Sequence, residues 1–239
     1  MKLSIIIPAY NEASTIRRVL ERVGSVELMD QTARQVVVID DGSTDGTREE
    51  VIRYQTGHPE VEVKLLHHEK NRGKGASIAT GIREADGDYI LIQDADLEYD
   101  PREYNQMLRP ALEGFADVVY GSRFVGSQPH RVLFFFHSVG NRFLTFLSNL
   151  FTNINITDME SGYKLFRADI LKNLRLKEKG FGFEVEVTAR ICRIPGIRIY
   201  EIGISYYGRT YKEGKKVNWK DGFHAIWCIL RYNLFTRRG

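Results

Sequence analysis

LSIIIPAYNE, residues 3–12, is the stretch that decides the fold, because its pattern of an apolar run followed by a polar loop recurs along the chain. Short runs rich in β-branched residues follow at 36–39, 61–66, 89–92 and 118–120, and like 3–7 they are typical of buried strands. Helical patterns lie between them at 12–23, 46–54, 74–85 and 101–112, with Asn11 and Asp100 as expected N-caps. This alternation predicts an α/β fold with a mostly parallel sheet and helices on both faces.

The loops that follow these strands are where binding is expected, because a parallel sheet binds its ligand at the carboxyl ends of its strands. The loop PAYNE, 8–12, lacks the glycine-rich signature of a dinucleotide fold, which argues against a nicotinamide enzyme. Tyr10 can stack on a base and Glu12 can accept hydrogen bonds from it, although a capped helix start explains the same residues. Asp40 and Asp41 are adjacent and repel one another, so a ribose or base that donates hydrogen bonds is the better explanation for them.

The next two loops carry charges of opposite sign. NRGKG, 71–75, lacks the full phosphate-loop pattern, so Lys74 either faces a nucleotide phosphate from a helix start or lies in a solvated basic turn. Asp94, Asp96 and Glu98 leave a buried strand at alternate positions, which is costly unless a cation or a network holds them. Their oxygen ligands suit Mg²⁺ or Mn²⁺, and the spacing is not that of a calcium loop.

The second half of the chain has a different character. Between 118 and 157 there are no acidic residues and three arginines, among many aromatic and aliphatic side chains. A strand at 162–166, a helix at 184–192, a strand at 197–204 and an aromatic helix at 220–235 are expected to follow. No linker interrupts the chain, so we expect one catalytic domain over 1–219, with halves at about 1–120 and 121–219, and a C-terminal amphipathic helix over 220–239.

The net charge of +3 on 239 residues hides an asymmetry. Up to Asp117 there are 14 basic and 22 acidic residues, and beyond it there are 20 and 9. The chain is too hydrophobic, at 43%, for a disordered protein. Its two cysteines cannot build a disulfide scaffold or a zinc site of cysteines alone, which favours a reducing compartment.

Two aromatic segments on a basic background, 131–151 and 220–235, fit helices that lie in a membrane interface, although a core-facing helix pair explains the first nearly as well. No apolar run reaches the roughly 20 residues that cross a bilayer, and we expect no signal peptide. Over 209–239, eight basic residues stand against two acidic ones, which favours anionic lipid. No nucleic-acid-binding module is recognisable. We therefore expect a cytoplasmic protein that associates peripherally with a membrane and does not bind nucleic acid.

The strand-end motifs together resemble a known family. IIIPAYNE (5–12), VIDDGSTD (38–45), NRGKG (71–75) and DAD (94–96) resemble the nucleotide-sugar half of glycosyltransferase family 2. GSR (121–123), GNR (140–142), Asp158 with SGY (161–163), and the stretch 209–216 resemble its polyprenyl-phosphate branch, typified by dolichol-phosphate mannose synthase. The resemblance implies an inverting hexosyltransferase with a Rossmann-like nucleotide-diphospho-sugar transferase fold of the GT-A type. It also implies a GDP-mannose or UDP-glucose type of donor, Mg²⁺ or Mn²⁺, and a polyprenyl phosphate acceptor.

The same resemblance implies roles for individual residues. Those expected to bind the base and ribose are Pro8, Tyr10, Glu12, Ile39 and Asp41. Asp94, Ala95 and Asp96 would lie along the ribose and diphosphate, with Lys74 facing a phosphate, and Asp96 and Glu98 would be the metal ligands. The residues expected to hold the acceptor phosphate are Arg123, Arg142, Arg209 and one of Lys215 and Lys216.

The acceptor decides whether the reaction needs a base. A phosphate monoester, with a second pKa of about 6, is already anionic at neutral pH, whereas a sugar hydroxyl must lose a proton as it attacks. For a hydroxyl acceptor, as in polysaccharide or glycoconjugate synthesis, Asp158 or Glu160 becomes the candidate base. Glu184 and Glu186 either border the pocket for the donor sugar or are carboxylates at a helix start, where the helix dipole stabilises them. A membrane-surface module that binds a nucleotide sugar without turnover is a third hypothesis.

Overall fold

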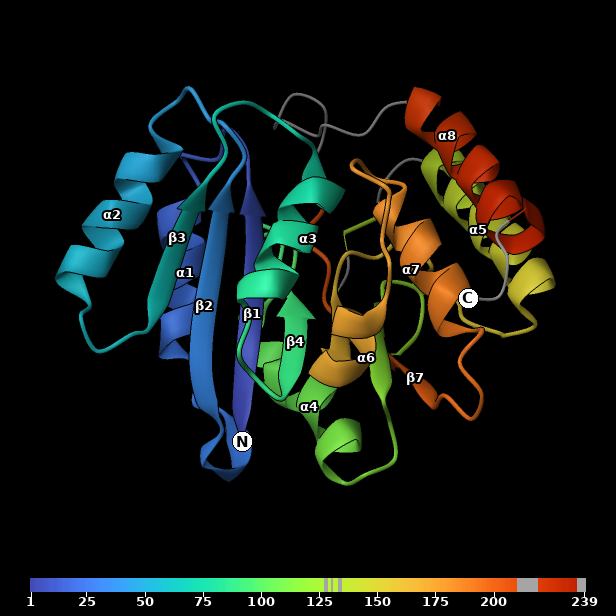
Figure 1. Cartoon of the computed structure of the whole chain (residues 1–239), viewed down its shortest axis with the longest axis horizontal. Helices are drawn as coiled ribbons and strands as arrows, with labels where there is room; N and C mark the ends of the chain where they lie inside the picture. The colour runs from blue at the N-terminus through green and yellow to red at the C-terminus, as the bar shows by residue number, and fades with distance from the viewer. Residues whose placement is uncertain (127–128, 130, 133–134, 210–218, 236–239) are drawn as a thin grey trace.

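The computed structural model of the chain describes residues 1–126, 129, 131–132, 135–209 and 219–235. Within these residues, seven strands form one sheet in the order β3-β2-β1-β4-β6-β5-β7 (Figure 1). The strands are β1 (Lys2–Ala9), β2 (Ala33–Asp40), β3 (Val63–His67), β4 (Tyr89–Ile92), β5 (Val118–Ser122), β6 (Lys164–Arg167) and β7 (Ile199–Gly203). Only β6 runs antiparallel to its neighbours, β4 and β5. The predicted mostly parallel sheet is therefore confirmed.

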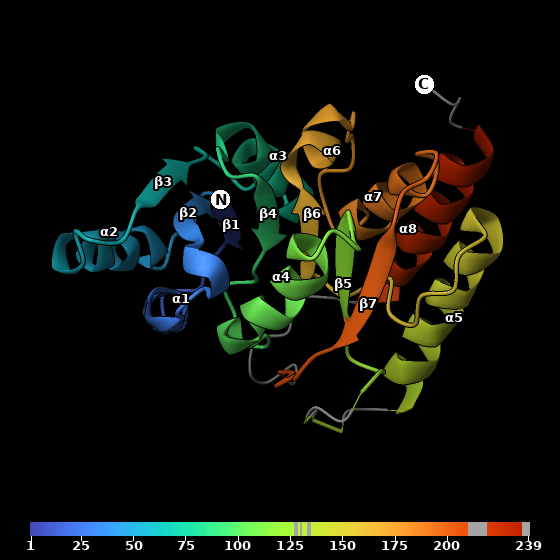
Figure 2. The same cartoon turned by 90° about the horizontal axis from the view of Figure 1, so that it is seen from below.

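Helices cover both faces of the sheet, as predicted (Figure 2). The helices are α1 (Ile16–Ser25), α2 (Thr47–Gly57), α3 (Lys74–Glu84), α4 (Tyr104–Leu112), α5 (Phe135–Thr152), α6 (Ala168–Asn173), α7 (Phe183–Ile191) and α8 (Trp219–Leu230). Single 3₁₀ turns lie at Met29–Gln31 and Pro101–Glu103, and a π-helical turn, Arg231–Phe235, ends the described chain. One core lies between the sheet and α1, α2 and α4, and the other lies between the sheet and α3, α6, α7 and α8.

The two expected N-caps have different outcomes. The Asp100 carboxylate accepts a hydrogen bond from the Arg102 backbone N–H at 3.0 Å, which confirms it as the cap of the turn before α4. The prediction for Asn11 is wrong, because α1 begins only at Ile16. Asn11 instead has a left-handed backbone (φ 51°), and its side-chain oxygen accepts a hydrogen bond from the Thr44 N–H at 2.9 Å. It joins the loop after β1 to the loop after β2.

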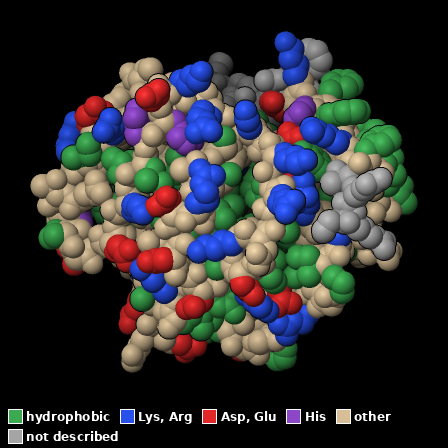
Figure 3. Space-filling model, viewed as in Figure 1, with side chains coloured by type: hydrophobic (Ala, Val, Ile, Leu, Met, Phe, Trp, Pro, Cys, Tyr) green, Lys and Arg blue, Asp and Glu red, His purple; other side chains and the backbone are tan. Residues whose placement is uncertain are grey.

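Helices α5 and α8, which correspond to the two aromatic segments of the sequence, pack against each other and against α7. Both helices also present large apolar side chains to the exterior, and Figure 3 shows hydrophobic atoms gathered at this end of the molecule. No helix in the described ranges is both long enough and apolar enough to span a bilayer. Lys215 and Lys216 lie outside the described residues.

Candidate functional site

Most of the sequence-predicted site residues within the described ranges gather at one edge of the sheet. Parallel strands β1, β2, β4, β5 and β7 all end there, and the antiparallel β6 begins there. This edge therefore brings together loops that are up to two hundred residues apart in sequence, as Arg209 and Glu12 show by their hydrogen bonds. The topology is the one that places ligands beyond the carboxyl ends of strands.

Three acidic side chains on this edge converge on one arginine. Arg209 donates two hydrogen bonds from its guanidinium to the Glu12 carboxylate, at 3.1 and 3.2 Å, and one to Asp96 Oδ2 at 3.1 Å. Its backbone N–H donates to Glu98 Oε1 at 2.6 Å. We call Glu12, Asp96 and Glu98 the carboxylate cluster. The sequence predicted Arg209 for an acceptor phosphate, and the structure places it among the predicted metal and donor ligands.

The carboxylate cluster holds more negative charge than Arg209 balances. Burial, together with the charges of Asp94 and Glu98, raises the pKa of Asp96 to about 7. Leu97, between the two predicted metal ligands, has a left-handed backbone with φ 65°, a conformation that costs a non-glycine residue of order 1 kcal/mol or more. Hard oxygen ligands and surplus negative charge are what Mg²⁺ and Mn²⁺ require, so these residues fit such an ion.

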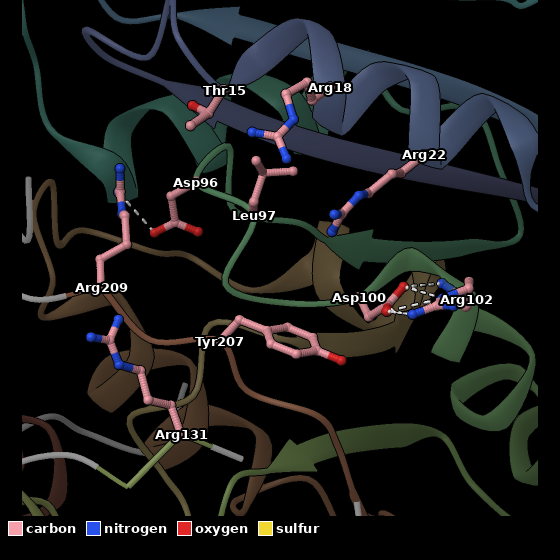
Figure 4. Close-up of a pocket in the computed structure, with 10 residues that line it drawn as sticks. All are labelled: Thr15, Arg18, Arg22, Asp96, Leu97, Asp100, Arg102, Arg131, Tyr207 and Arg209. Carbon is pink, nitrogen blue, oxygen red and sulfur yellow. Dashed lines mark hydrogen bonds and ion pairs between the residues drawn. The ribbon is translucent and has the colours of Figure 1, made fainter. Parts of the chain in front are cut away.

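A pocket of about 570 Å³ opens beside the carboxylate cluster (Figure 4). Arg18 and Arg22 reach toward it from α1, while Tyr207 and Arg131 approach from the opposite side, and Asp96 and Arg209 lie at one end. Its lining is thus mainly cationic, which suits a ligand that carries phosphate groups.

Lys74 does not face open solvent. Its ammonium group lies 2.7 Å from Asp94 Oδ1 and 3.6 Å from Glu184 Oε1. Burial lowers the pKa of Lys74, but the charges of Asp94 and Glu184 outweigh this and raise it. A Cβ atom at Gly162 would lie 2.7 Å from Asp94 Oδ2 and 2.8 Å from Lys74 Nζ, so a larger residue there would displace this pair. Lys74 and Asp94 thus form a close ion pair at the carboxyl ends of the strands.

Asp40 and Asp41 have structural partners that sequence reasoning missed. Asp40 Oδ2 lies 2.9 Å from His67 Nδ1, and Asp41 Oδ1 lies 2.6 Å from His68 Nδ1. Asp41 also accepts hydrogen bonds from the backbone N–H groups of Arg72 and Gly73, at 3.0 and 2.8 Å. Adjacent histidines after the third strand were the available signal. The paired aspartates are therefore explained in part by the loops they hold.

The remaining residues expected at the base and ribose differ in exposure. Pro8 is half-buried and Tyr10 is exposed at the end of β1, so both border the open edge. Ile39 has no exposed surface and packs in the core between the sheet and α3, and Ala95 is also buried. Ile39 therefore contributes to the site through packing beneath it.

The predicted acceptor side is organised around a second arginine. Arg123 follows β5 and donates from Nε and Nη2 to the two oxygens of Asp158, at 2.6 and 2.7 Å, and its backbone N–H adds a bond of 3.0 Å. Asp158 is completely buried. The Arg123 guanidinium carbon lies 5.2 Å from the centre of the Tyr206 ring. The Phe124 ring contacts two arginines: its centre lies 5.8 Å from the guanidinium carbon of Arg123 and 5.5 Å from that of Arg142, an exposed residue of α5.

Three further ionisable groups lie in this half of the chain: Glu160, Lys164 and Glu186. Lys164, in β6, is fully buried and bonds the Glu184 carboxylate and the Met159 and Ser161 carbonyl groups. Sequence reasoning missed it, because a single lysine in the apolar run 163–166 reads as an edge residue. Burial and the charge of Glu184 raise the pKa of Glu160 to about 7. Glu160 Oε1 has no hydrogen-bond partner within the part of the chain that the structure describes.

Glu186 is buried, and its carboxylate accepts hydrogen bonds from the backbone N–H groups of Lys177 and Glu178, both at 2.7 Å.

Comparisons with known proteins identify relatives over nearly the whole chain. An undecaprenyl-phosphate mannosyltransferase from Micrococcus luteus is 31% identical over 249 aligned residues, which cover 99% of this chain and 96% of the relative. A dolichol-phosphate mannosyltransferase from Pyrococcus furiosus is 25% identical over 91% of this chain and 61% of its own length.

The fold is also found in solved structures. Glucosyl-3-phosphoglycerate synthase from Mycobacterium tuberculosis, solved with Mn²⁺, UDP and glucosyl-3-phosphoglycerate, matches all of this chain and 82% of its own at 19% identity, with a TM-score of 0.72. The same enzyme solved with Mg²⁺ and UDP matches with a TM-score of 0.73. These matches confirm the predicted transferase fold. The family model described as Glycosyl transferase family 2 matches residues 4–175. The chain is therefore an enzyme of glycosyltransferase family 2.

Proposed function

We propose that this enzyme transfers a hexose from a GDP- or UDP-linked sugar to a polyprenyl phosphate at a membrane surface, with the help of a divalent cation. The observation that carries the acceptor assignment is the closed ion pair between Arg123 and Asp158. Because Asp158 is bound to Arg123, it is not available as a base on the acceptor side. Arg142, on the same side, is exposed to solvent. The two mannosyltransferase relatives bear polyprenyl phosphates in their names, which supports the same class of acceptor.

On the donor side, Asp96 and Glu98 would hold Mg²⁺ or Mn²⁺, with Glu12 beside them. The ion would offset the negative charge that develops on the leaving nucleoside diphosphate. The carboxylate cluster counts three acidic groups against one guanidinium, a surplus that a divalent cation would balance. Arg209 is then available to a phosphate group, since arginine binds phosphate through the same donors that now bind carboxylates.

On the acceptor side, an anionic phosphate oxygen would attack the anomeric carbon directly. No side chain has to remove a proton in that step, because the phosphate monoester is already ionised. Arg142 would bind the phosphate, and Asp158 would hold the Arg123 guanidinium in a fixed position next to Tyr206. The displacement is a single step, so the configuration at the anomeric carbon is inverted.

The membrane is the expected source of the acceptor. Exposed apolar side chains lie on both α5 and α8: Phe135, Phe136, Phe143, Phe146 and Leu150 on α5, and Phe223 and Trp227 on α8. Arg142 lies on α5 among them. A helix with aromatic side chains and a nearby cation suits the interface between lipid headgroups and acyl chains.

An acceptor panel tests this proposal. The protein is incubated with Mn²⁺ or Mg²⁺, GDP-mannose or UDP-glucose, and either a short polyprenyl phosphate, the matching polyprenol, or soluble sugars. We expect a sugar-phosphate lipid as the product, formed only from the polyprenyl phosphate. Transfer to a sugar hydroxyl while the polyprenyl phosphate stays unreacted would overturn the acceptor assignment. Binding of the nucleotide sugar without turnover of any acceptor would support a binding module.

One observation favours a hydroxyl acceptor as the second candidate. Glu160 has a pKa raised to about 7, a value suited to a general base at neutral pH. A polysaccharide or glycoconjugate hydroxyl could give its proton to this group. The acceptor panel distinguishes the two, because only a hydroxyl acceptor needs the base.

A further inference from the structure

A second group of metal-ligating side chains lies away from the catalytic edge, where α8 meets the segment before α7. His224 and Cys228 are one turn apart on α8 and so face the same way. Glu178 reaches them from the loop before α7, and its Oε2 lies 3.1 Å from His224 Nε2. Cys228 Sγ lies 3.4 Å from the same nitrogen, and the three ligand atoms all lie within 4.8 Å of one another. We call Glu178, His224 and Cys228 the three-ligand cluster.

These separations match those between ligands of one metal ion. Ligands of a tetrahedral zinc at about 2.0 to 2.3 Å from the ion lie roughly 3.3 to 3.7 Å from each other. The separations of 3.1 and 3.4 Å are close to this range, but hydrogen bonds would produce them too. The surroundings of the three atoms therefore decide between a metal site and a hydrogen-bonded group.

The first feature of the surroundings is the space among the three atoms. A Cβ atom at Gly182 would lie 2.9 Å from Cys228 Sγ, 3.0 Å from Glu178 Oε2 and 3.1 Å from His224 Nε2. Any other residue at this position would thus fill a space that all three ligand atoms border. Gly182 has an ordinary helical backbone, so its conformation does not explain the glycine. The convergence of the three ligand atoms on this position explains why a glycine is needed there.

The second feature is the support of the carboxylate. Glu178 Oε1 accepts a hydrogen bond from the Tyr232 hydroxyl at 2.6 Å and lies 3.3 Å from Arg231 Nη1. These contacts fix the carboxylate and leave Oε2 directed to His224. Outer-shell hydrogen bonds of this kind orient metal ligands in known sites. Cys228 is completely buried, whereas the His224 side chain is about half exposed, at 48%, which provides a path for an ion.

We propose that Glu178, His224 and Cys228 form a zinc site, with solvent as the fourth ligand. A thiolate and an imidazole select Zn²⁺, whereas the all-carboxylate cluster at the sheet edge selects Mg²⁺ or Mn²⁺, so the two sites bind different ions. Binding releases the Cys228 thiol proton to solvent. The bound ion would tie α8 to the segment that leads into α7, and so would hold the helix that carries Phe223 and Trp227.

The charges around the three-ligand cluster predict its pH dependence. Burial and the nearby Glu178 raise the pKa of Cys228 to about 12, with Glu186 adding to the effect and Arg231 opposing it. The free thiol is therefore protonated at neutral pH, and His224 must also be neutral to bind an ion. Zinc affinity is expected to increase as the pH rises, because each ligand must lose its proton first.

Cobalt spectroscopy of the full chain tests the proposal without reference to glycosyl transfer. Co²⁺ bound to a thiolate absorbs in the near ultraviolet by charge transfer, and carboxylate-bound Co²⁺ does not. We expect this band in the wild type and in Cys192→Ser, which removes the other cysteine, and no band in Cys228→Ser. His224→Ala should weaken Co²⁺ binding at this band at least about tenfold. One equivalent of Zn²⁺ should abolish the band, and Mg²⁺ should leave it unchanged.

A thermal unfolding series protects the test against a variant that does not fold. His224 is exposed, so His224→Ala is expected to fold even if Cys228→Ser does not. Zn²⁺ should raise the unfolding midpoint of the wild type by more than that of His224→Ala, since an ion that binds the folded state stabilises it in proportion to the logarithm of its affinity. No charge-transfer band in the wild type would show a hydrogen-bonded trio, and a band that survives Cys228→Ser would assign the thiolate ligand to Cys192; either result overturns the proposal.

Discussion

The two arginine–carboxylate groups at the edge where the parallel strands end differ in net charge. Arg123 has one carboxylate partner, the completely buried Asp158, and donates to both of its oxygens. Arg209 faces three carboxylates and shares its donors among them. The first group is neutral and complete. The second retains negative charge, so a further cation can bind there, and this difference separates a structural ion pair from a ligand site.

The positions of the two arginines in the chain reinforce the difference. Arg123 directly follows β5, and Asp158 lies six residues before β6, in a loop whose Thr157 and Asp158 backbone N–H groups donate hydrogen bonds to the Glu201 carboxylate of β7, the other neighbour of β5. The sheet itself thus holds both partners. Arg209 lies six residues beyond the end of β7, in a loop whose backbone is tied to the site by hydrogen bonds from Tyr207 and Arg209 to Glu98. Its guanidinium can leave the carboxylates without moving a strand.

The largest effect is expected from Asp96→Ala, which removes a member of the carboxylate cluster. We expect turnover to fall by at least about 10³-fold, because the leaving diphosphate loses its metal-based charge stabilisation. Mn²⁺ affinity, measured by calorimetry, should fall with it. Glu113→Gln, which removes an exposed carboxylate from outside the site, is the control and should change neither quantity. Full Mn²⁺ affinity in Asp96→Ala would contradict this assignment of the metal ligands.

The next largest effect is expected from Asp158→Asn, and it is on stability. The change leaves the Arg123 guanidinium largely buried beside a neutral partner, so the free energy of unfolding should fall by about 3 kcal/mol. Urea denaturation followed by circular dichroism measures this. The double variant Arg123→Leu with Asp158→Leu should recover most of the loss, because it removes both charges. If Asp158→Asn unfolds at the urea concentration of the wild type, the pair is not the complete structural unit described above.

Arg209→Ala tests the open character of the carboxylate cluster. Removing the guanidinium should tighten Mn²⁺ binding to the nucleotide-free protein about tenfold, since two cations compete for the same oxygens. Arg142→Ala, which removes an arginine that contacts no member of the carboxylate cluster, should leave Mn²⁺ affinity unchanged. Calorimetry without nucleotide is the measurement. Weaker Mn²⁺ binding in Arg209→Ala would mean that the arginine positions the carboxylates and does not compete for them.

The sequence predicted more of the donor side than of the acceptor side. The strand 89–92 and the carboxylates after it could be located because apolar runs mark strands, and topology places their ends together. The convergence of Glu12, Asp96 and Glu98 follows from that rule, although the sequence did not show Arg209 among them. That contact depends on the path of a loop beyond β7, which no local pattern fixes.

The acceptor side depends on contacts that pattern reasoning cannot resolve. Asp158 was a candidate base and Arg123 a phosphate ligand, and the structure pairs them. The sequence indicates Asp40 and Asp41 as ligand-binding carboxylates, and their partners are His67, the last residue of β3, and His68, which follows it. In each case the sequence identifies the residue type, and the partner comes from a distant segment. Tertiary pairing therefore decides whether a charged group is free to bind a ligand.

The smallest effect is expected from Glu160→Gln, and it settles the acceptor chemistry. With a polyprenyl phosphate acceptor no base is needed, so kcat should change by less than about threefold. With a hydroxyl acceptor, kcat should fall by about 10²- to 10⁴-fold. The pH profile adds a second readout: because the pKa of Glu160 is raised to about 7, a Glu160 base would make kcat rise as the pH climbs through 7, and Glu160→Gln would remove that rise. A flat profile in both proteins would show that no group on the acceptor side takes a proton from the acceptor, which is the result expected for a phosphate bound by Arg142.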